Sequence, residues 1–487
     1  MRAHGQFGTV PVQAAASGAA RGVRGAAASL GGVMKANFDP LRLMLFLLII
    51  MNVSRVHQHF PFLRPLRPAM LLVLLTALYA YLNPKFVVLE NLFRTWPAKV
   101  IAALGIMACL SVPLSISMGA SAKFILEEYS KVLVFAFLLI ISVRNTRDLY
   151  TLVWGFTLAI GFLSLLSLFV FRMSSAGGVM RIAGGYSYDA NDIGTVCVVG
   201  IGIALLMFQS STGLKKAVTG LVLLGAGMAI AKTGSRGAFV GLVALGAALL
   251  VMLKTVRLDK RIGFVLVVGL GIGLAAPQGY WEQMGTLLSP KEDYNWSSPT
   301  GRKAVAKRGI TYMMRNPVTG IGIDNFGRAE GLISERARNF RVGMAGIKWS
   351  AAHNSFLQAA AEMGLPGVTL FSTLIFGSIV GMNRLRRRLP RHWSKGDAEE
   401  RFLYLASLYL PVAMIGFAVA GFFVSFAYLD LVYILAAFVA ATYICVDQRL
   451  GKAGTAPAVP AAPPVPVVGR TVAAARPRGP EWRSARR

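Results

Sequence analysis

Several long stretches of this sequence contain no charged residue, and they limit the possible fold more than any other feature. These stretches cover residues 101–122, 149–171, 237–253, 262–277, 365–383 and 402–429. A helix of about 18 to 20 apolar residues is long enough to cross the hydrocarbon core of a bilayer. A water-soluble domain could not bury so many such segments. The sequence therefore predicts an all-α integral membrane protein.

We expect twelve transmembrane helices between two disordered basic tails. The tails are the Ala/Gly-rich residues 1–36 and the Ala/Pro-rich residues 447–487, whose compositions cannot supply a packed core. Helices 1–9 should occupy residues 37–277, and helices 10–12 residues 356–446. The predicted spans are 39–53, 69–83, 98–118, 130–143, 149–171, 193–209, 215–231, 237–253, 262–277, 356–383, 402–421 and 427–446.

The distribution of positive charge predicts the orientation of these helices. Alternate loops are basic, and their sequences are RNTR (144–147), Lys215-Lys216, KTVRLDKR (254–261) and RLRRRLPRHWSK (384–395). Cytoplasmic loops of membrane proteins carry such an excess of Lys and Arg. Both termini are therefore expected in the cytoplasm. The loop with Arg55, Arg64 and Arg67 deviates from this pattern.

The one long loop, residues 278–355, is then expected to form a domain on the outer side of the membrane. It holds eleven Lys and Arg against six Asp and Glu. Long loops escape the positive-inside rule, so this excess needs another explanation. The net charge of +30 would suggest nucleic acid in a soluble protein, but no nucleic-acid module is present here. We expect the loop to bind an anionic ligand other than nucleic acid.

Arg236 lies in TGSRG, between the predicted seventh and eighth spans. A guanidinium at the start of a helix is a poor partner for the helix dipole, unless an anion lies between them. Arg side chains and helix N-termini both bind phosphate oxygens. Arg236 is thus a candidate to bind an anionic group such as a phosphate. The alternative is an interfacial arginine that reaches lipid headgroups.

His353 precedes Asn354 at the end of the long loop, in AAHNSF. Imidazole titrates near neutral pH and can act as a general base on a hydroxyl group. Asn354 could bind substrate or cap the next helix. A capping or interfacial histidine is the alternative.

Further candidates lie on the same predicted outer side. Arg302 and Arg308 could bind the anionic group, or they could belong to a solvated helix face. Asn191 and Asp192 could contact a substrate, although capping of the sixth span is the simpler role for at least one of them. Acidic residues on this side are too sparse to predict a metal site. We expect no metal and no cofactor.

These residues stand in an order that resembles a known family. The motifs are YDANDIG, TGSRGAFVGL, NPVTGIGIDNF, AAHNSFLQAAAEMGLPG and GFFVSFAYLDLVYILAAF, between about residues 100 and 445. Together they resemble the O-antigen ligase / O-antigen polymerase superfamily of bacterial membrane glycosyltransferases.

The resemblance implies a GT-C-like helical membrane fold and a metal-independent, inverting glycosyl transfer. The donor would be a glycan on undecaprenyl diphosphate, and the acceptor a hydroxyl of lipid A-core. The protein would lie in the bacterial inner (plasma) membrane, with residues 278–355 as a periplasmic loop that helps to form the active site. Arg236 would then hold the diphosphate, His353 would be the base, and Arg302 or Arg308 would be the loop arginine.

Other functions stay open at this point. An O-antigen or exopolysaccharide polymerase and a protein O-glycan ligase share the same motifs. A transporter of polysaccharide or lipid-linked glycan is a more distant alternative, which lacks support from internal repeats or from charged residues inside the spans.

Overall fold

A computed structural model of the chain describes residues 34–63, 65–176, 179–185, 187–254, 256–289, 301–334 and 351–454. The chain divides into two units, Met1–Gln448 and Arg449–Arg487, and all contacts described below lie within the first. Residues 1–33 and 455–487 of the predicted tails lie outside the described part. So do residues 290–300 and 335–350 of the long loop.

The described residues are mostly helical, and a helix lies at each of the twelve predicted ranges. These helices are α2 (Pro40–Ser54), α3 (Pro68–Leu82), α4 (Trp96–Ser111), α6 (Ser130–Ser142), α7 (Thr146–Leu165), α8 (Ala190–Ser210), α9 (Gly213–Thr233), α10 (Arg236–Met252), α11 (Leu258–Ala275), α17 (Ser355–Arg388), α18 (Ala398–Ala420) and α19 (Asp430–Gly454).

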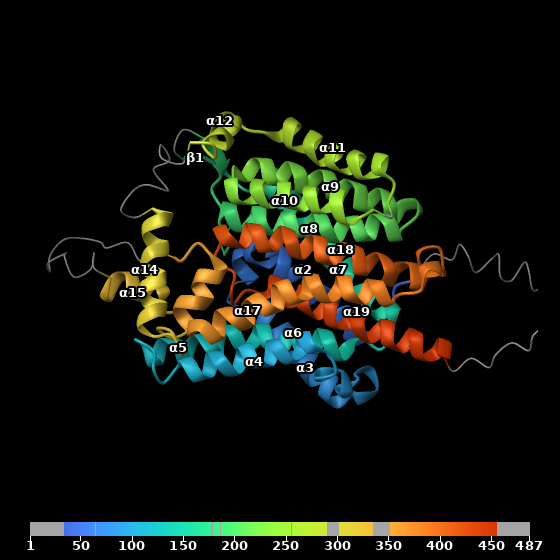
Figure 1. Cartoon of the computed structure of the whole chain (residues 1–487), viewed down its shortest axis with the longest axis horizontal. Helices are drawn as coiled ribbons and strands as arrows, with labels where there is room; N and C mark the ends of the chain where they lie inside the picture. The colour runs from blue at the N-terminus through green and yellow to red at the C-terminus, as the bar shows by residue number, and fades with distance from the viewer. Residues whose placement is uncertain are drawn as a thin grey trace, which may run out of the picture. The chain divides into compact units, whose positions relative to one another are not determined.

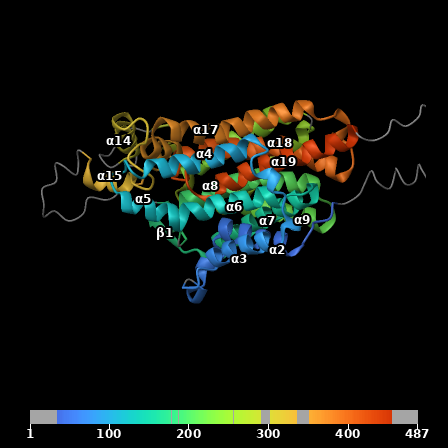
Figure 2. The ribbon, with the colours of Figure 1, turned by 90° about the horizontal axis from the view of Figure 1, so that it is seen from below.

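Six helices of the described chain are long and apolar enough to cross a membrane: α7, α8, α9, α17, α18 and α19. Four more apolar helices, α2, α3, α4 and α10, are shorter. These apolar helices agree with an all-α membrane protein. The prediction that twelve helices cross the membrane stays a prediction. Figures 1 and 2 show the helices running side by side as one bundle.

Burial distinguishes central from peripheral helices. Most residues of α8, α18 and α19 are buried. In contrast, α3 exposes Leu71, Leu74, Leu75 and Leu78. An apolar face without a protein neighbour is the expected outer surface of a helix that meets lipid.

Short elements gather at one end of the bundle. They include α5 (Met118–Phe124), which a π-helical turn joins to α6, and a hairpin of β1 (Met173–Ala176) and β2 (Val179–Ile182). The hairpin is antiparallel, with Ser174 opposite Arg181. Three helices of the long loop, α12 (Tyr280–Gly285), α14 (Arg302–Arg315) and α15 (Phe326–Leu332), complete this end. Both views place α5, α14 and α15 together there (Figures 1 and 2).

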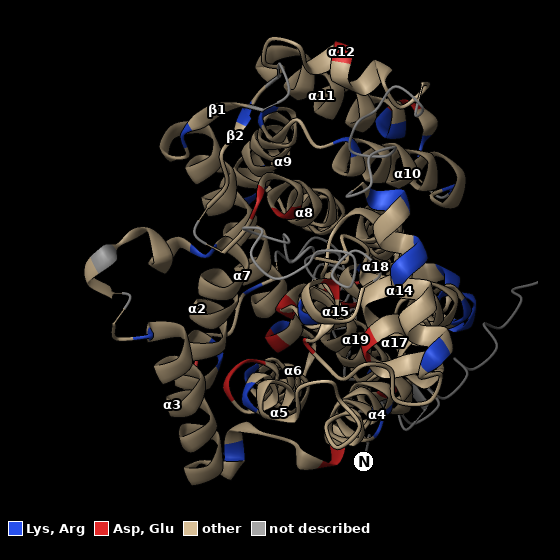
Figure 3. Ribbon diagram, turned by 90° about the vertical axis from the view of Figure 1, so that its left-hand side faces the viewer, with Lys and Arg blue, Asp and Glu red and all other residues tan. Residues whose placement is uncertain are grey.

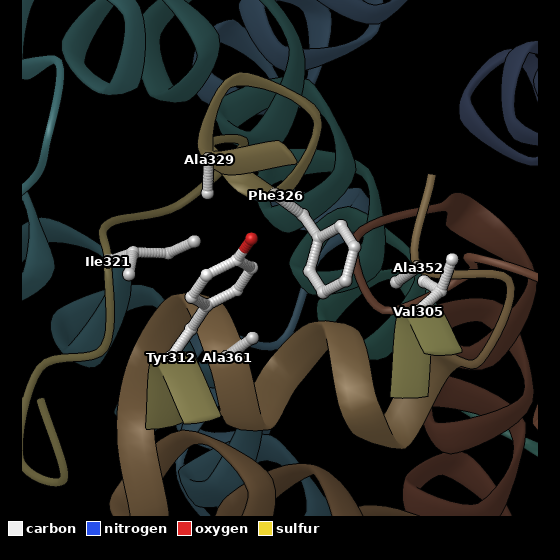
Figure 4. Close-up of a cluster of buried hydrophobic side chains, with 7 residues drawn as sticks. All are labelled: Val305, Tyr312, Ile321, Phe326, Ala329, Ala352 and Ala361. Atoms are coloured by element: carbon white, nitrogen blue, oxygen red, sulfur yellow. The ribbon is translucent and has the colours of Figure 1, made fainter. Parts of the chain in front are cut away.

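The long loop has a small hydrophobic core of its own. Val305 and Tyr312 of α14 meet Phe326 and Ala329 of α15, and Ala361 of α17 closes the cluster. Figure 4 shows the Tyr312 ring lying over α17, with its hydroxyl turned toward α15. The start of α17 therefore belongs to the same packing unit as the loop.

At a break in α17, backbone hydrogen bonds join the long loop to the helix bundle. Gly364 has φ 68° and ψ −164°, and Pro366 follows it. Proline has no amide hydrogen, so the carbonyl of Glu362 loses its helical partner. That carbonyl instead accepts from Gly322 N at 3.0 Å.

Other backbone groups at the break also form hydrogen bonds with the long loop. Ala361 O accepts from Ile321 N at 2.9 Å, and Leu365 N donates to Pro317 O at 2.7 Å. The Glu362 carboxylate accepts from the amides of Asp324 (3.0 Å) and Phe326 (2.8 Å). Because buried backbone groups need partners, segment 316–326 and the break stabilise each other.

Candidate functional site

His353 and Asn354 form the entry to α17, and the loop between α18 and α19 holds them there. We call this loop, residues 421–429, the α18–α19 loop. Asn354 caps α17, because its side chain accepts from Phe356 N and Leu357 N at 3.0 Å each. His353 has φ 48°, a left-handed conformation that non-glycine residues rarely adopt.

Two serines hold His353 in this conformation. The backbone amide of His353 donates to Ser425 Oγ at 2.9 Å. Ser355 Oγ donates to Val424 O at 2.8 Å and accepts from Phe426 N at 2.9 Å. A strained backbone conformation of this kind persists only where surrounding contacts enforce it, and such conformations cluster at functional sites.

Arg236 is the first residue of α10, as TGSRG predicted. Gly234 ends α9 with φ 57°, and Ser235 caps α10 by accepting from Ala238 N at 3.2 Å. The half-buried Arg236 side chain donates to Thr286 Oγ1 at 2.8 Å, just beyond α12. The turn therefore directs the guanidinium toward the long loop.

Phe423 of the α18–α19 loop lies between α10 and α14. A Cβ atom added to Gly237 would lie only 2.4 Å from Phe423 Cβ, so the start of α10 packs directly on this side chain. The Arg302 guanidinium carbon lies 5.5 Å from the centroid of the Phe423 ring, within the range of a cation–π contact. One short loop thus contacts Arg302, the residue after Arg236, and His353.

Arg308 has a different environment, although it lies less than two turns from Arg302 on α14. Its Nε atom donates to both carboxylate oxygens of Glu330, at 2.8 and 2.9 Å. Tyr312 donates to the same carboxylate at 2.8 Å. The hydrogen bond with Glu330 raises the pKa of the Arg308 guanidinium. This pair joins α14 to α15 and stabilises the loop itself.

Asn191 and Asp192 lie in the first turn of α8. Asp189 is the N-cap residue, and it accepts from the amides of Asn191 (2.6 Å) and Asp192 (2.9 Å). The Asp192 carboxylate accepts from Asp189 N at 3.0 Å, which completes a capping box. A capping role was thus correctly expected for one of the predicted pair, but the N-cap itself was not identified.

The start of α8 lies against the turn that carries Arg236. A Cβ atom added to Gly194 would lie 2.6 Å from Ala238 Cβ and 3.2 Å from Thr233 Oγ1. Figure 3 shows acidic residues at the start of α8 and basic residues along α14 at this end of the molecule. Within the described ranges, no group of three or more His, Cys, Asp or Glu is placed to hold a metal ion. Metal independence stays a prediction.

Residues 219–372 match the O-antigen ligase family model. This match confirms the resemblance to the O-antigen ligase superfamily in that part of the chain. The O-antigen ligase region runs from α9 into α17 and contains five of the predicted site residues: Arg236, Arg302, Arg308, His353 and Asn354. Asn191, Asp192 and the α18–α19 loop lie outside it. No curated protein matches the chain.

Several residues around the O-antigen ligase region were not predicted as part of the site. Ser425 and Phe423 lie in a stretch without charged residues, and no local motif there indicates a role in chemistry. Glu362 was not predicted either, and its carboxylate binds amides of segment 316–326. A buried carboxylate next to a helix-breaking Gly-Leu-Pro could have indicated that role.

Proposed function

We propose that this protein is an O-antigen ligase-like glycosyltransferase. It would move a glycan from undecaprenyl diphosphate to a hydroxyl of lipid A-core, at the periplasmic face of the bacterial plasma membrane. The observation that carries the proposal is the α18–α19 loop, whose Phe423 and Ser425 contact the elements that bear Arg236, Arg302 and His353. The family match supports the glycosyltransferase class.

The two arginines suit a diphosphate leaving group. Arg236 lies at the start of α10, and Arg302 at the start of α14. Negative charge develops on the diphosphate as its bond to the sugar breaks. Fixed cations aimed at developing charge lower the barrier of such a reaction. In this proposal Arg302 is the loop arginine, because its guanidinium packs on the Phe423 ring of the α18–α19 loop, whereas Arg308 binds Glu330.

An apolar cavity along α10 suits the prenyl chain of the donor. Its volume is about 420 Å³, and apolar residues of α8, α10 and α11 line it. The α10 residues of this lining begin at Phe239, only three residues after Arg236. A lipid with its diphosphate at Arg236 could therefore extend its chain along the same helix. Burial of apolar surface would contribute to donor affinity.

His353 is the proposed general base. The acceptor oxygen forms a bond to the anomeric carbon while the bond from that carbon to the diphosphate oxygen breaks. The bonding electron pair leaves with the diphosphate, and the hydroxyl proton passes to the His353 imidazole. A single displacement of this kind inverts the anomeric centre. Proton transfer by a positioned base typically contributes about 10²- to 10⁴-fold.

The deciding experiment uses purified full-length protein with a labelled glycan on undecaprenyl diphosphate and lipid A-core as acceptor, with and without EDTA. EDTA-insensitive labelling of lipid A-core supports the ligase. Longer carrier-linked chains without labelled acceptor would identify a polymerase instead. Labelling of protein in membranes would identify a protein O-glycan ligase. Absence of transfer to any of these acceptors contradicts the glycosyltransferase proposal.

A further inference from the structure

A second cavity, of about 160 Å³, lies where α2, α3, α6 and α19 meet the α18–α19 loop. It is separate from the apolar cavity along α10, because the two share no lining residue. Its polar lining residues are Asn52, Arg55, Glu128, Lys131, Tyr428 and Asp430. None of them has a role in the chemistry described above.

Two ion pairs line this cavity. The first joins Arg55 to Asp430 at 3.1 Å, with side chains only 18% and 12% exposed. The second joins Lys131 to Glu128 at 3.0 Å, with side chains 30% and 63% exposed. The Arg55 pair therefore forms the floor of the cavity, and the Lys131 pair lies at its mouth. Arg55 has φ 54°, which is rare outside glycine.

The charges of the lining point to an uncharged ligand. Each cation already faces a carboxylate, so an entering phosphate would meet two anions as well as two cations. A hydroxyl group both donates and accepts hydrogen bonds, so it can use carboxylates and guanidinium groups together. Tyr428 adds an aromatic surface to the lining. A neutral polyhydroxyl ring fits this set, and the volume suits one sugar ring rather than a prenyl chain.

The α18–α19 loop connects this cavity to the proposed catalytic centre. Ser425 binds the backbone of His353, and three residues further on Tyr428 lines the cavity. Arg55 also follows α2 at a loop that deviates from the positive-inside rule. A role in ligand binding would explain why Arg55 lies on the predicted outer side of the membrane.

We propose that this cavity binds one uncharged sugar ring of the acceptor glycan, and that the α18–α19 loop positions this ring relative to His353. The proposal rests on the proposed function for the identity of the acceptor. Arg55 and Asp430 would bind ring hydroxyls at the floor, and Glu128 would bind one at the mouth.

The test compares E128Q with E127Q, since Glu127 is the adjacent exposed carboxylate and does not line the cavity. E128Q should raise the KM for lipid A-core at least fivefold, with kcat and the KM for the carrier-linked donor unchanged. E127Q should match wild type. A second variant, A69W, fills the cavity from α3 without altering either ion pair, and it should raise the same KM.

Saturation-transfer NMR on the full chain measures the binding of delipidated core oligosaccharide without any catalytic turnover. Weaker binding to E128Q and A69W than to E127Q supports the cavity, even if no transfer occurs. Unchanged acceptor KM and binding in both variants would overturn the cavity proposal and leave the glycosyltransferase intact. Displacement of the oligosaccharide by inorganic phosphate would also overturn it, because the site would then be an anion site.

Discussion

The backbone amide of His353 donates a hydrogen bond to Ser425 Oγ over 2.9 Å, although the two residues are 72 positions apart in the chain. His353 is thereby held in a left-handed conformation by a loop that also contacts α10 and α14. Ser425 is a positioning residue in this arrangement.

S425A should lower kcat/KM about fivefold, because a typical hydrogen bond contributes about 1 kcal/mol. If His353 is the base, the loss should fall on kcat, and the pH profile of kcat should change. S394A, in the short 3-10 helix Arg391–Ser394 that follows the far end of α17, is the control and should behave like wild type. If S425A left kcat and its pH profile unchanged, the α18–α19 loop would have no role in positioning His353 for the reaction.

Replacement of His353 itself gives the larger effect. H353Q should reduce transfer at least 100-fold, since the amide cannot accept the proton of the acceptor hydroxyl. Donor binding should persist, which retention of labelled donor on purified protein would measure. Near-normal transfer by H353Q would exclude the base assignment.

Arg302 and Arg315 lie at opposite ends of the same helix and provide a matched pair. R302A should lower transfer at least tenfold and weaken donor binding, because a cation facing the leaving group is lost. Arg315 is exposed, so R315A should change neither. Equal activity of the two variants would contradict the role proposed for Arg302.

Arg308 should affect stability more than chemistry. R308A leaves the Glu330 carboxylate, only 4% exposed, without its guanidinium partner. Loss of one partner of a buried pair costs about 3 kcal/mol or more, and the lower end is expected here because Tyr312 still donates to Glu330. A lower midpoint of thermal unfolding than that of R315A would confirm this. A normal midpoint together with a large activity loss would instead place Arg308 in the reaction.

The break in α17 offers a test of the loop's anchoring. A Cβ atom at residue 364 would lie 2.5 Å from Pro317 O, and φ there is 68°. G364A should displace segment 316–326 and reduce transfer strongly, while the protein still inserts into the membrane. Gly263 has open space around it, so G263A is the control. Protease sensitivity of the long loop should rise in G364A alone.

Apolar runs predicted the positions of the helices well, because their length reflects the bilayer and depends little on tertiary contacts. The β1–β2 hairpin was missed, since two four-residue strands give no clear alternation. Arg302 and Arg308 could not be distinguished from spacing, because the deciding partner, Glu330, lies 22 residues from Arg308. Ser425 and Glu362 act through backbone amides of distant segments, which no local pattern encodes.

The break at Gly364 has a consequence for how such proteins can be recombined. Residues 355–363 share hydrogen bonds and a hydrophobic core with the long loop, whereas the remainder of α17 faces the bundle. The boundary between the two modules therefore lies inside a helix. A chimera that exchanges outer loops between relatives should keep its junction at Gly364, because a junction at Ser355 would separate the loop from the surface that folds with it.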